Sequence, residues 1–535
     1  MSWSDLFKNK KSVLNKKKIE TIKSAGGAYQ GITLGKSLDE NIKSLQVIFK
    51  DCDDVVFRSF KIAGRIKAEL VFIDGMIKSE AVDDFIMKPL ILESRIAGVQ
   101  IENENEAFRY TKEAIVSTAN IKETKELESI LFSIMSGGAV IMIDRQEYAL
   151  IVEAKGFEHR QVEQPTGENA IRGPRDAFTE TLGINTTLIR RRIRDPRLKA
   201  KKYYIGERSK TEVVIMYIED IVDPKLVDQV YKRLDGIDVD SIVGSGFIEQ
   251  LIEDDWISPF PQVKTTERPD RVAAALMEGK VCILVDNTPY ILIVPATMSD
   301  LLTAPDDYYE RWLVASLIRF VRLIGAVTAT VLPSLYIAMV SYHPEMIPST
   351  LALSIATGRQ GMPFPAFIEA FIMEAVFELI REASIRLPGS LGQTIGVVGA
   401  VVIGQAAVSA GVVSPAMVVV VALTGIANFA VPSFDVALSY RVLRFGLMLL
   451  STVLGMYGII LGALLILSHL CILKSFGIPY MAPWIPLTWR DLKDTLIRSP
   501  WLSMRRRPAF MHTQDKKRMD LDSYEETLRQ RKDKA

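Results

Sequence analysis

Two kinds of hydrophobic pattern divide the chain at about residue 305. Before this point, apolar runs of strand length, such as Leu70–Ile73 and Val213–Ile218, alternate with helical segments and polar turns. After it the apolar runs become much longer, and Leu387–Phe434 covers 48 residues without one charged side chain. Because about 20 apolar helical residues cross a hydrocarbon layer about 30 Å thick, this run predicts two membrane spans placed back to back.

An internal repeat lies in the first half of the chain. Residues 135–152 align without a gap to residues 277–294, with eight identities in eighteen positions. Each copy has the pattern of a helix that ends at a glycine, followed by a hairpin of two strands. The identical pairs are Met135/Met277, Gly137/Gly279, Ile141/Ile283, Asp144/Asp286, Tyr148/Tyr290, Leu150/Leu292, Ile151/Ile293 and Val152/Val294.

The repeat predicts two similar α/β subdomains, over 38–157 and 158–305, after a basic and disordered N-terminal tail at 1–37. Two related lobes can close on a small ligand, as hinge proteins do. A duplicated scaffold that serves only assembly would show the same repeat, so the pattern leaves both interpretations open. The tail is either solvated or in contact with anionic lipid.

The second half has the pattern of a helical transmembrane domain over 306–485. Its predicted spans are 318–342, 390–411, 414–434 and 445–473, and glycines at helical spacing, such as Gly455, Gly458 and Gly462, suit close helix contacts. Arginines and lysines flank the first and last spans, which places both ends in the cytoplasm and requires an even number of crossings. Arg441 and Arg444 then fall on the outside in a four-span count, a conflict that a re-entrant segment would remove. The predicted fold is therefore two tandem α/β subdomains followed by a polytopic all-α membrane domain, with a charged cytoplasmic segment at 486–535.

A helical segment at 362–386 carries a stripe of acidic residues. Glu374, Glu378 and Glu382 recur every four residues and share one helical face, and Glu369 lies one turn earlier. Ionisable groups beside membrane spans usually face a polar cavity or pore, and a ring of such helices would form a cation-selective lining. An amphipathic helix at the membrane surface is the alternative. Since Arg381 and Arg386 are the only nearby cations in sequence, we expect no separate basic partner for each carboxylate.

Four arginines stand close together between the two copies of the repeat. Arg190, Arg191, Arg192 and Arg194 lie near the end of a helix predicted to begin near Asp176 and to stop before Pro196. This cluster is either a solvated face or a subunit contact to an acidic surface.

Composition excludes several classes of function. The net charge of +1 carries no signature of nucleic-acid binding. Three distant cysteines and four scattered histidines indicate neither a disulfide framework nor a metal site. No nucleophile–base pair, phosphate loop or cofactor motif stands out, so we expect no enzyme and no cofactor.

Several longer motifs carry a family resemblance over about 38–510. The run GENAIRGPRDAFTETLGINTTLIRRRIRDPRLK, the strand LVFIDGM, the segments IVGSGFIEQLIEDDWISPFPQ and TERPDRVAAALMEGKV, and RSPWLSMRRRP together resemble the A subunit of GerA-type spore germinant receptors. A stage V sporulation membrane protein shares this A-subunit fold, and these motifs separate the two poorly.

The resemblance implies a subunit of a nutrient receptor in the spore inner membrane, with its N-terminal domain on the cytoplasmic, spore-core side. It implies a homo-oligomeric ring, of which a pentamer is one form, that passes cations when nutrient binds. It also implies a transporter-like B subunit and a lipoprotein C subunit as partners, and contact with lipid. The alternatives are a related sporulation channel or scaffold and a secondary transporter, for which inverted repeats in the membrane half would be expected.

Overall fold

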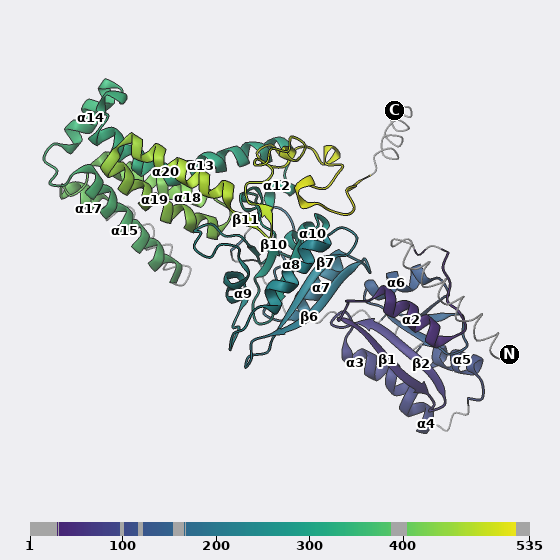
Figure 1. Cartoon of the computed structure of the whole chain (residues 1–535). Helices are drawn as coiled ribbons and strands as arrows, with labels where there is room; N and C mark the ends of the chain where they lie inside the picture. The colour runs from purple at the N-terminus through teal and green to yellow at the C-terminus, as the bar shows by residue number, and fades with distance from the viewer. Residues whose placement is uncertain are drawn as a thin grey trace, which may run out of the picture.

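The computed structural model describes residues 29, 31–96, 101–115, 121–153, 165, 167–168, 170–386 and 404–519. Most of the predicted N-terminal tail, most of the predicted span 390–411 and the end of the C-terminal segment lie outside these residues. Figure 1 shows two α/β lobes, then a group of long helices, with the second lobe between the first lobe and the helices.

The first lobe is a five-stranded antiparallel sheet with helices on both faces. Its strands lie in the order β1-β2-β4-β5-β3. The central strand β4 is buried on both faces: Val140 and Met142 pack beneath α2 and α6, whereas Ile141 packs beneath the helices on the other side. The elements of this lobe are α2 (Leu38–Ile48), β1 (Val55–Ile62), β2 (Ile66–Ile73), α3 (Ser79–Val82), a π-helix (Asp83–Glu93), α4 (Ser94–Ile96), α5 (Glu104–Ile115), β3 (Ile121–Thr124), α6 (Leu127–Met135), β4 (Ala139–Ile143) and β5 (Ala149–Val152).

The second lobe repeats this topology strand for strand. Its sheet has the order β6-β7-β9-β10-β8, and its helices cover both faces in the same way. The predicted pair of similar subdomains is thus confirmed. Its elements are α7 (Leu182–Arg192), β6 (Leu198–Ile205), β7 (Thr211–Ile218), α8 (Pro224–Asp235), α9 (Ser245–Ile252), β8 (Lys264–Thr266), α10 (Pro269–Met277), β9 (Val281–Val285) and β10 (Ile291–Val294).

The aspartates shared by the two copies of the repeat form equivalent hydrogen bonds in the two lobes. Asp144 Oδ1 accepts a hydrogen bond from the backbone N–H of Leu38, the first residue of α2, at 3.3 Å. Asp286 Oδ1 accepts from Leu182, the first residue of α7, also at 3.3 Å. Each carboxylate satisfies an N–H that the first turn of a helix leaves without a partner.

Helix α7 begins later than its sequence suggests. Residues Asp176–Thr181 precede the helix, and the Asn185 side chain closes this segment by accepting from Thr179 N at 2.8 Å and donating to Thr179 O at 2.6 Å. The helix therefore starts at Leu182 rather than near Asp176, because a side chain takes the place of helical hydrogen bonds.

The second half of the chain is helical. Two of its described helices, α13 (Trp312–Ser341) and α19 (Phe434–Leu454), are long and apolar enough to cross a membrane. They run side by side with α18 and α20 (Figure 1). The other elements are α11 (Met298–Leu301), α12 (Asp306–Tyr309), α14 (Ser349–Arg359), α15 (Ala366–Arg386), α17 (Gly404–Ser409), α18 (Pro415–Phe429), α20 (Met456–Ile472), β11 (Lys474–Ser475) and β12 (Ile478–Pro479).

The predicted span 445–473 is divided between two helices. The chain turns at Gly455, whose φ of 58° favours glycine, and α20 then folds back along α19. A Cβ on Gly458 would lie 2.1 Å from Leu450 O, and one on Gly462 would lie 2.3 Å from Leu447 Cδ2. These glycines permit the close helix contact that their spacing predicted, but the contact lies within one tight hairpin rather than between two full spans.

Candidate functional site

Arg190 of α7 joins the two lobes through a buried ion pair. Its Nε lies 2.7 Å from Asp54 Oδ2 and its Nη2 lies 2.8 Å from Asp54 Oδ1, while Nη1 donates to Leu198 O at 2.6 Å. The guanidinium is fully buried, and Asp54 immediately precedes β1 of the other lobe. The charge and hydrogen bonds of Asp54 raise the pKa of Arg190 against the lowering effect of burial.

The other three arginines of this cluster differ in their surroundings. Arg192 forms an ion pair with Asp176 inside the same lobe, at 2.6 Å. Arg191 lines a cavity between the lobes, and Arg194 is exposed. Because Arg191 and Arg194 are the exposed members of the cluster, a contact to another subunit would depend mainly on these two.

A cavity of about 390 Å³ lies where the lobes meet. Asp54, Asp74 and Gly75 line it from the first lobe. From the second lobe its lining carries both signs of charge and several hydroxyl groups, and Lys202 pairs with Glu212 at 2.9 Å. Such a lining can bind a small ligand that has both a cationic and an anionic group. The lining side chains of the second lobe that carry these groups are Thr181, Thr186, Thr187, Arg191, Lys202, Glu212 and Asp286.

Gly75 keeps the two lobes in close contact, and we expect Gly75→Ala to disturb the cavity. Gly75 has a φ of +76°, and a Cβ there would lie 2.8 Å from Thr187 Oγ1 of the facing lobe. Overpacking of this kind costs about 1–3 kcal/mol. The check is the thermal unfolding midpoint of the full chain, with Gly31→Ala as control, since Gly31 has a φ of +77° and nothing within 4 Å. Equal midpoints for the two variants, or no recovery when Thr187→Ala is added to Gly75→Ala, would contradict this role.

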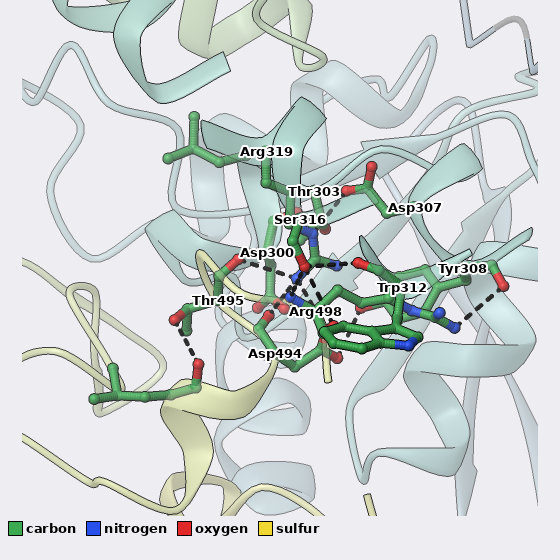
Figure 2. Close-up of polar contacts among 12 residues, drawn as sticks. Asp300, Thr303, Asp307, Tyr308, Trp312, Ser316, Arg319, Asp494, Thr495 and Arg498 are labelled. Atoms are coloured by element: carbon green, nitrogen blue, oxygen red, sulfur yellow. Dashed lines mark hydrogen bonds and ion pairs between the residues drawn. The ribbon is translucent and has the colours of Figure 1, made fainter. Parts of the chain in front are cut away.

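A second group of charges, the junction cluster, ties the start of α13 to the C-terminal segment, and three of its four members are buried. It consists of Asp307, Arg319, Arg322 and Asp494, which Figure 2 shows in part. Arg319 Nε lies 3.0 Å from Asp307 Oδ2 and its Nη1 lies 3.0 Å from Asp494 Oδ1, while Arg322 Nη1 lies 2.7 Å from Asp307 Oδ2. Burial raises the pKa of Asp494 to about 6, although Arg319 opposes the shift.

Direct hydrogen bonds also attach the second lobe to the helices. Ser258 Oγ lies 2.8 Å from His469 Nε2 of α20, and Thr265 Oγ1 donates to Asp435 Oδ2 of α19 at 3.2 Å. The N–H of Met298 donates to Tyr480 O at 2.9 Å. The second lobe is therefore hydrogen bonded directly to the start of α19 and the end of α20.

A third group, the ionic cluster, lies among the apolar helices. It comprises Glu369, Glu374, Glu378 and Arg381 of α15, with Arg359 of α14 and Arg441 and Arg444 of α19.

The contacts in the ionic cluster are specific. Glu369 Oε1 lies 3.2 Å from Arg359, and its other oxygen accepts from Ser414 N at 3.0 Å. Arg444 Nη2 lies 3.1 Å from Glu374 and 2.8 Å from Glu378, and Arg441 lies 3.0 Å from Glu378. Glu369, Glu374 and Arg444 are fully buried.

The acidic stripe is thus present, but the expectation that its carboxylates lack separate basic partners is wrong for Glu374 and Glu378. Their partners come from α19 and that of Glu369 comes from α14, which the sequence around α15 does not reveal. Glu382, the last residue of the stripe, is exposed. The structure also gives Arg441 and Arg444 a place against buried carboxylates, so they need not lie in an external loop.

Sequence reasoning missed Asp54 and Arg359 entirely. Asp54 follows Asp53 in an ordinary polar turn, and Arg359 ends a short helix, so neither carries a local signal. Arg441 and Arg444 did have a recognisable sequence signal, because they are two charged residues at i, i+3 spacing in an otherwise apolar helix. In the part of the chain that the structure describes, no group of three or more His, Cys, Asp or Glu residues is placed to hold a metal ion.

Comparisons with known proteins identify the family of this chain. The family model described as Bacillus/Clostridium GerA spore germination protein matches residues 43–510. The uncharacterized membrane protein YfkQ of Bacillus subtilis is 43% identical over 476 residues, covering 89% of this chain and 91% of the relative. Spore germination protein KA of Bacillus subtilis is 40% identical over 493 residues, covering 92% and 90%.

One solved structure is also similar in sequence. The crystal structure of the N-terminal domain of the A subunit of the Bacillus megaterium spore germinant receptor GerK3 is 34% identical. The match covers 50% of this chain and 98% of that chain, with a TM-score of 0.40. Because the family model covers most of the sequence and the relatives match over nearly their whole length, this chain belongs to the GerA family of spore germination proteins.

Proposed function

We propose that the chain is the A subunit of a nutrient germinant receptor and forms a cation channel that triggers spore germination. In this proposal it is a multi-pass protein of the spore inner membrane, with both lobes on the cytoplasmic, spore-core side. Family membership supports the role in germination, and the apolar helices α13 and α19 support the membrane location.

The observation that carries the channel proposal is the ionic cluster. Buried ionisable groups among membrane helices are costly and usually mark an ion path. Several polar atoms of the cluster have no hydrogen-bond partner among the described residues, including Glu374 Oε1, Arg444 Nε and Arg381 Nη2. Buried polar atoms of this kind gain from contact with water or a passing ion. Glu369, Glu374, Glu378 and Glu382 are therefore the residues we place along the ion path.

The same contacts suggest a closed state. With the arginines bound to Glu374 and Glu378, no carboxylate of this pair is free to attract a cation. Opening would require a movement of α19 relative to α15 that exchanges these partners. The second lobe is hydrogen bonded to the start of α19 and the end of α20, so closure of the lobes on a ligand has a direct route to this movement.

Assembly completes the proposal. We place the chain in a homo-oligomeric ring, of which a pentamer is one form, with a transporter-like B subunit and a lipoprotein C subunit as partners. Arg191 and Arg194 are the arginines of the α7 cluster that would contact a neighbouring copy, because their side chains are exposed.

Cation release from spores tests the channel. We expect Glu378→Gln/Glu382→Gln to slow release after a mixture of amino acids and glucose is added, by roughly tenfold, because the charge that concentrates cations is removed. The control is Glu113→Gln/Glu207→Gln, which makes the same charge change at two exposed positions in the lobes. Immunoblots must show equal protein levels in all strains.

The possible outcomes separate the alternatives. Equal release from both double mutants would remove α15 from the ion path and assign it to the membrane surface. Absence of single-channel currents when the purified chain is placed in lipid bilayers would indicate a scaffold. Release that requires uptake of a second solute would indicate a secondary transporter.

A further inference from the structure

The tryptophans gather where the second lobe meets the long helices. Of the six in the sequence, Trp3 lies outside the described residues. Trp312 is the first residue of α13, and Trp256 lies two residues before Ser258, which is bound to α20. Trp484 packs in the apolar cluster that joins Phe260, Met298 and Leu470. Because tryptophan is enriched where membrane helices meet the headgroups, this level of the molecule fits a membrane surface.

The C-terminal segment is held at the same level. Arg498 N donates to Ser316 Oγ of α13 at 3.0 Å, and Asp494 pairs with Arg319 of the same helix (Figure 2). This attachment leaves a row of apolar side chains uncovered, with Trp489 78% and Trp501 53% exposed. The exposed apolar residues of the segment are Ile485, Leu487, Trp489, Leu496, Ile497, Trp501 and Leu502.

The same segment also exposes basic side chains. Arg490, Lys493 and Arg506 are exposed and line a cavity of about 280 Å³. Lys493 and Arg506 have no ion-pair partner among the described residues.

The acidic groups around the same cavity are already engaged. Asp494 pairs with Arg319 at 3.0 Å, Asp300 with Lys280 at 2.5 Å and Glu278 with Arg518 at 2.8 Å. Asp491 Oδ2 accepts from the N–H of Ala509 at 2.8 Å. Three basic groups without an ion pair among the described residues, Arg490, Lys493 and Arg506, thus stand against one such carboxylate, Asp491, and the resulting positive charge suits a phosphate group.

We propose that residues 485–506 form a docking surface for anionic phospholipids of the leaflet next to the lobes. Trp489 and Trp501 lie at the level of the headgroups, and Arg490, Lys493 and Arg506 bind their phosphates. Membrane lipid is favoured over a protein partner because the surface is continuous with α13, a helix able to cross the membrane, and combines exposed tryptophan with unpaired basic groups. Since Asp494 in this surface also holds Arg319, headgroup binding is linked to the first turns of α13.

Hydrogen exchange of the full chain in detergent, titrated with phosphatidylglycerol, tests the proposal. We expect residues 485–506 to become protected as the lipid is added, and phosphatidylcholine to have little effect. Lys493→Gln/Arg506→Gln should raise the half-saturating fraction of phosphatidylglycerol by about fivefold for each charge removed. The matched control is Lys43→Gln/Lys50→Gln, the same charge change at two exposed positions in the first lobe.

Three results would overturn the docking surface. One is equal half-saturation in the wild type and the Lys493/Arg506 variant. Another is equal protection by phosphatidylcholine and phosphatidylglycerol. The third is protection that rises with protein concentration in the absence of lipid, which would assign the surface to contacts between copies of the chain.

Discussion

Arg190→Met is expected to lower the free energy of unfolding by about 3–5 kcal/mol, because it leaves Asp54 buried without its ion-pair partner. The side chain of Asp54 is only 7% exposed, and its two oxygens are held by the guanidinium. The loss should appear as a lower thermal midpoint of the full chain and as faster hydrogen exchange in α7. Because the pair joins the two lobes, the first lobe should also separate from the second at a lower denaturant concentration.

Two further variants distinguish this effect from a general loss of arginine. Arg194→Met changes the same kind of residue four positions away, and its exposure predicts an effect within about 0.5 kcal/mol. Arg190→Met/Asp54→Leu removes both charges and should recover most of the stability, since a buried ion pair can be replaced by apolar groups. If Arg190→Met and Arg194→Met melt at the same temperature, the pair does not hold the lobes together.

Arg444→Met is expected to have an effect of similar size, about 3–5 kcal/mol, on the helical half. Arg444 is fully buried and is the ion-pair partner of Glu374, which is also fully buried. Its loss removes the arginine that forms an ion pair with Glu374 among the described helices, and it takes one of three arginines from Glu378. The thermal midpoint of the detergent-solubilised full chain measures the loss.

A control variant and a compensating second substitution test whether the effect of Arg444→Met comes from the ionic cluster. Arg311→Met changes an exposed arginine at the start of α13 and should leave the midpoint nearly unchanged. Adding Glu374→Gln to Arg444→Met removes the unbalanced charge and should restore part of the stability. A midpoint for Arg444→Met equal to that of Arg311→Met would show that the ionic cluster does not stabilise the helices.

Most of the lobes could be predicted from local pattern. The 142-residue offset identified the duplicated hairpins, and the paired sheets follow from it. The start of α7 was placed about six residues too early, since the closure of Thr179 by the Asn185 side chain has no signal in the apolar pattern. The helical half was predicted less well. An apolar run of 29 residues has the same hydrophobic pattern whether it forms one tilted span or a helical hairpin that turns at Gly455.

The candidate sites were predicted in part. The acidic stripe and the arginine cluster were recognised as unusual, and both prove to be built around buried charges. Two of their partners were not recognised, because Asp54 lies in a polar turn and Arg359 ends a short helix, and neither position has a local signal. An exposed aspartate and a buried, paired one have the same sequence signature.

There is a physical reason why the sequence determined the secondary structure of this protein whereas only the tertiary structure decided its ion pairs. The period and length of apolar runs are properties of consecutive residues, so the duplicated α/β lobes, the helical second half and the unusual charges within it were all available from the chain itself. Which acid meets which arginine depends on how distant segments pack: Arg190 and Asp54 are 136 positions apart, and Arg444 and Glu378 are 66 apart. Burial then decides the energetics, since the same ion pair contributes little at the surface but costs several kcal/mol to break once water is excluded.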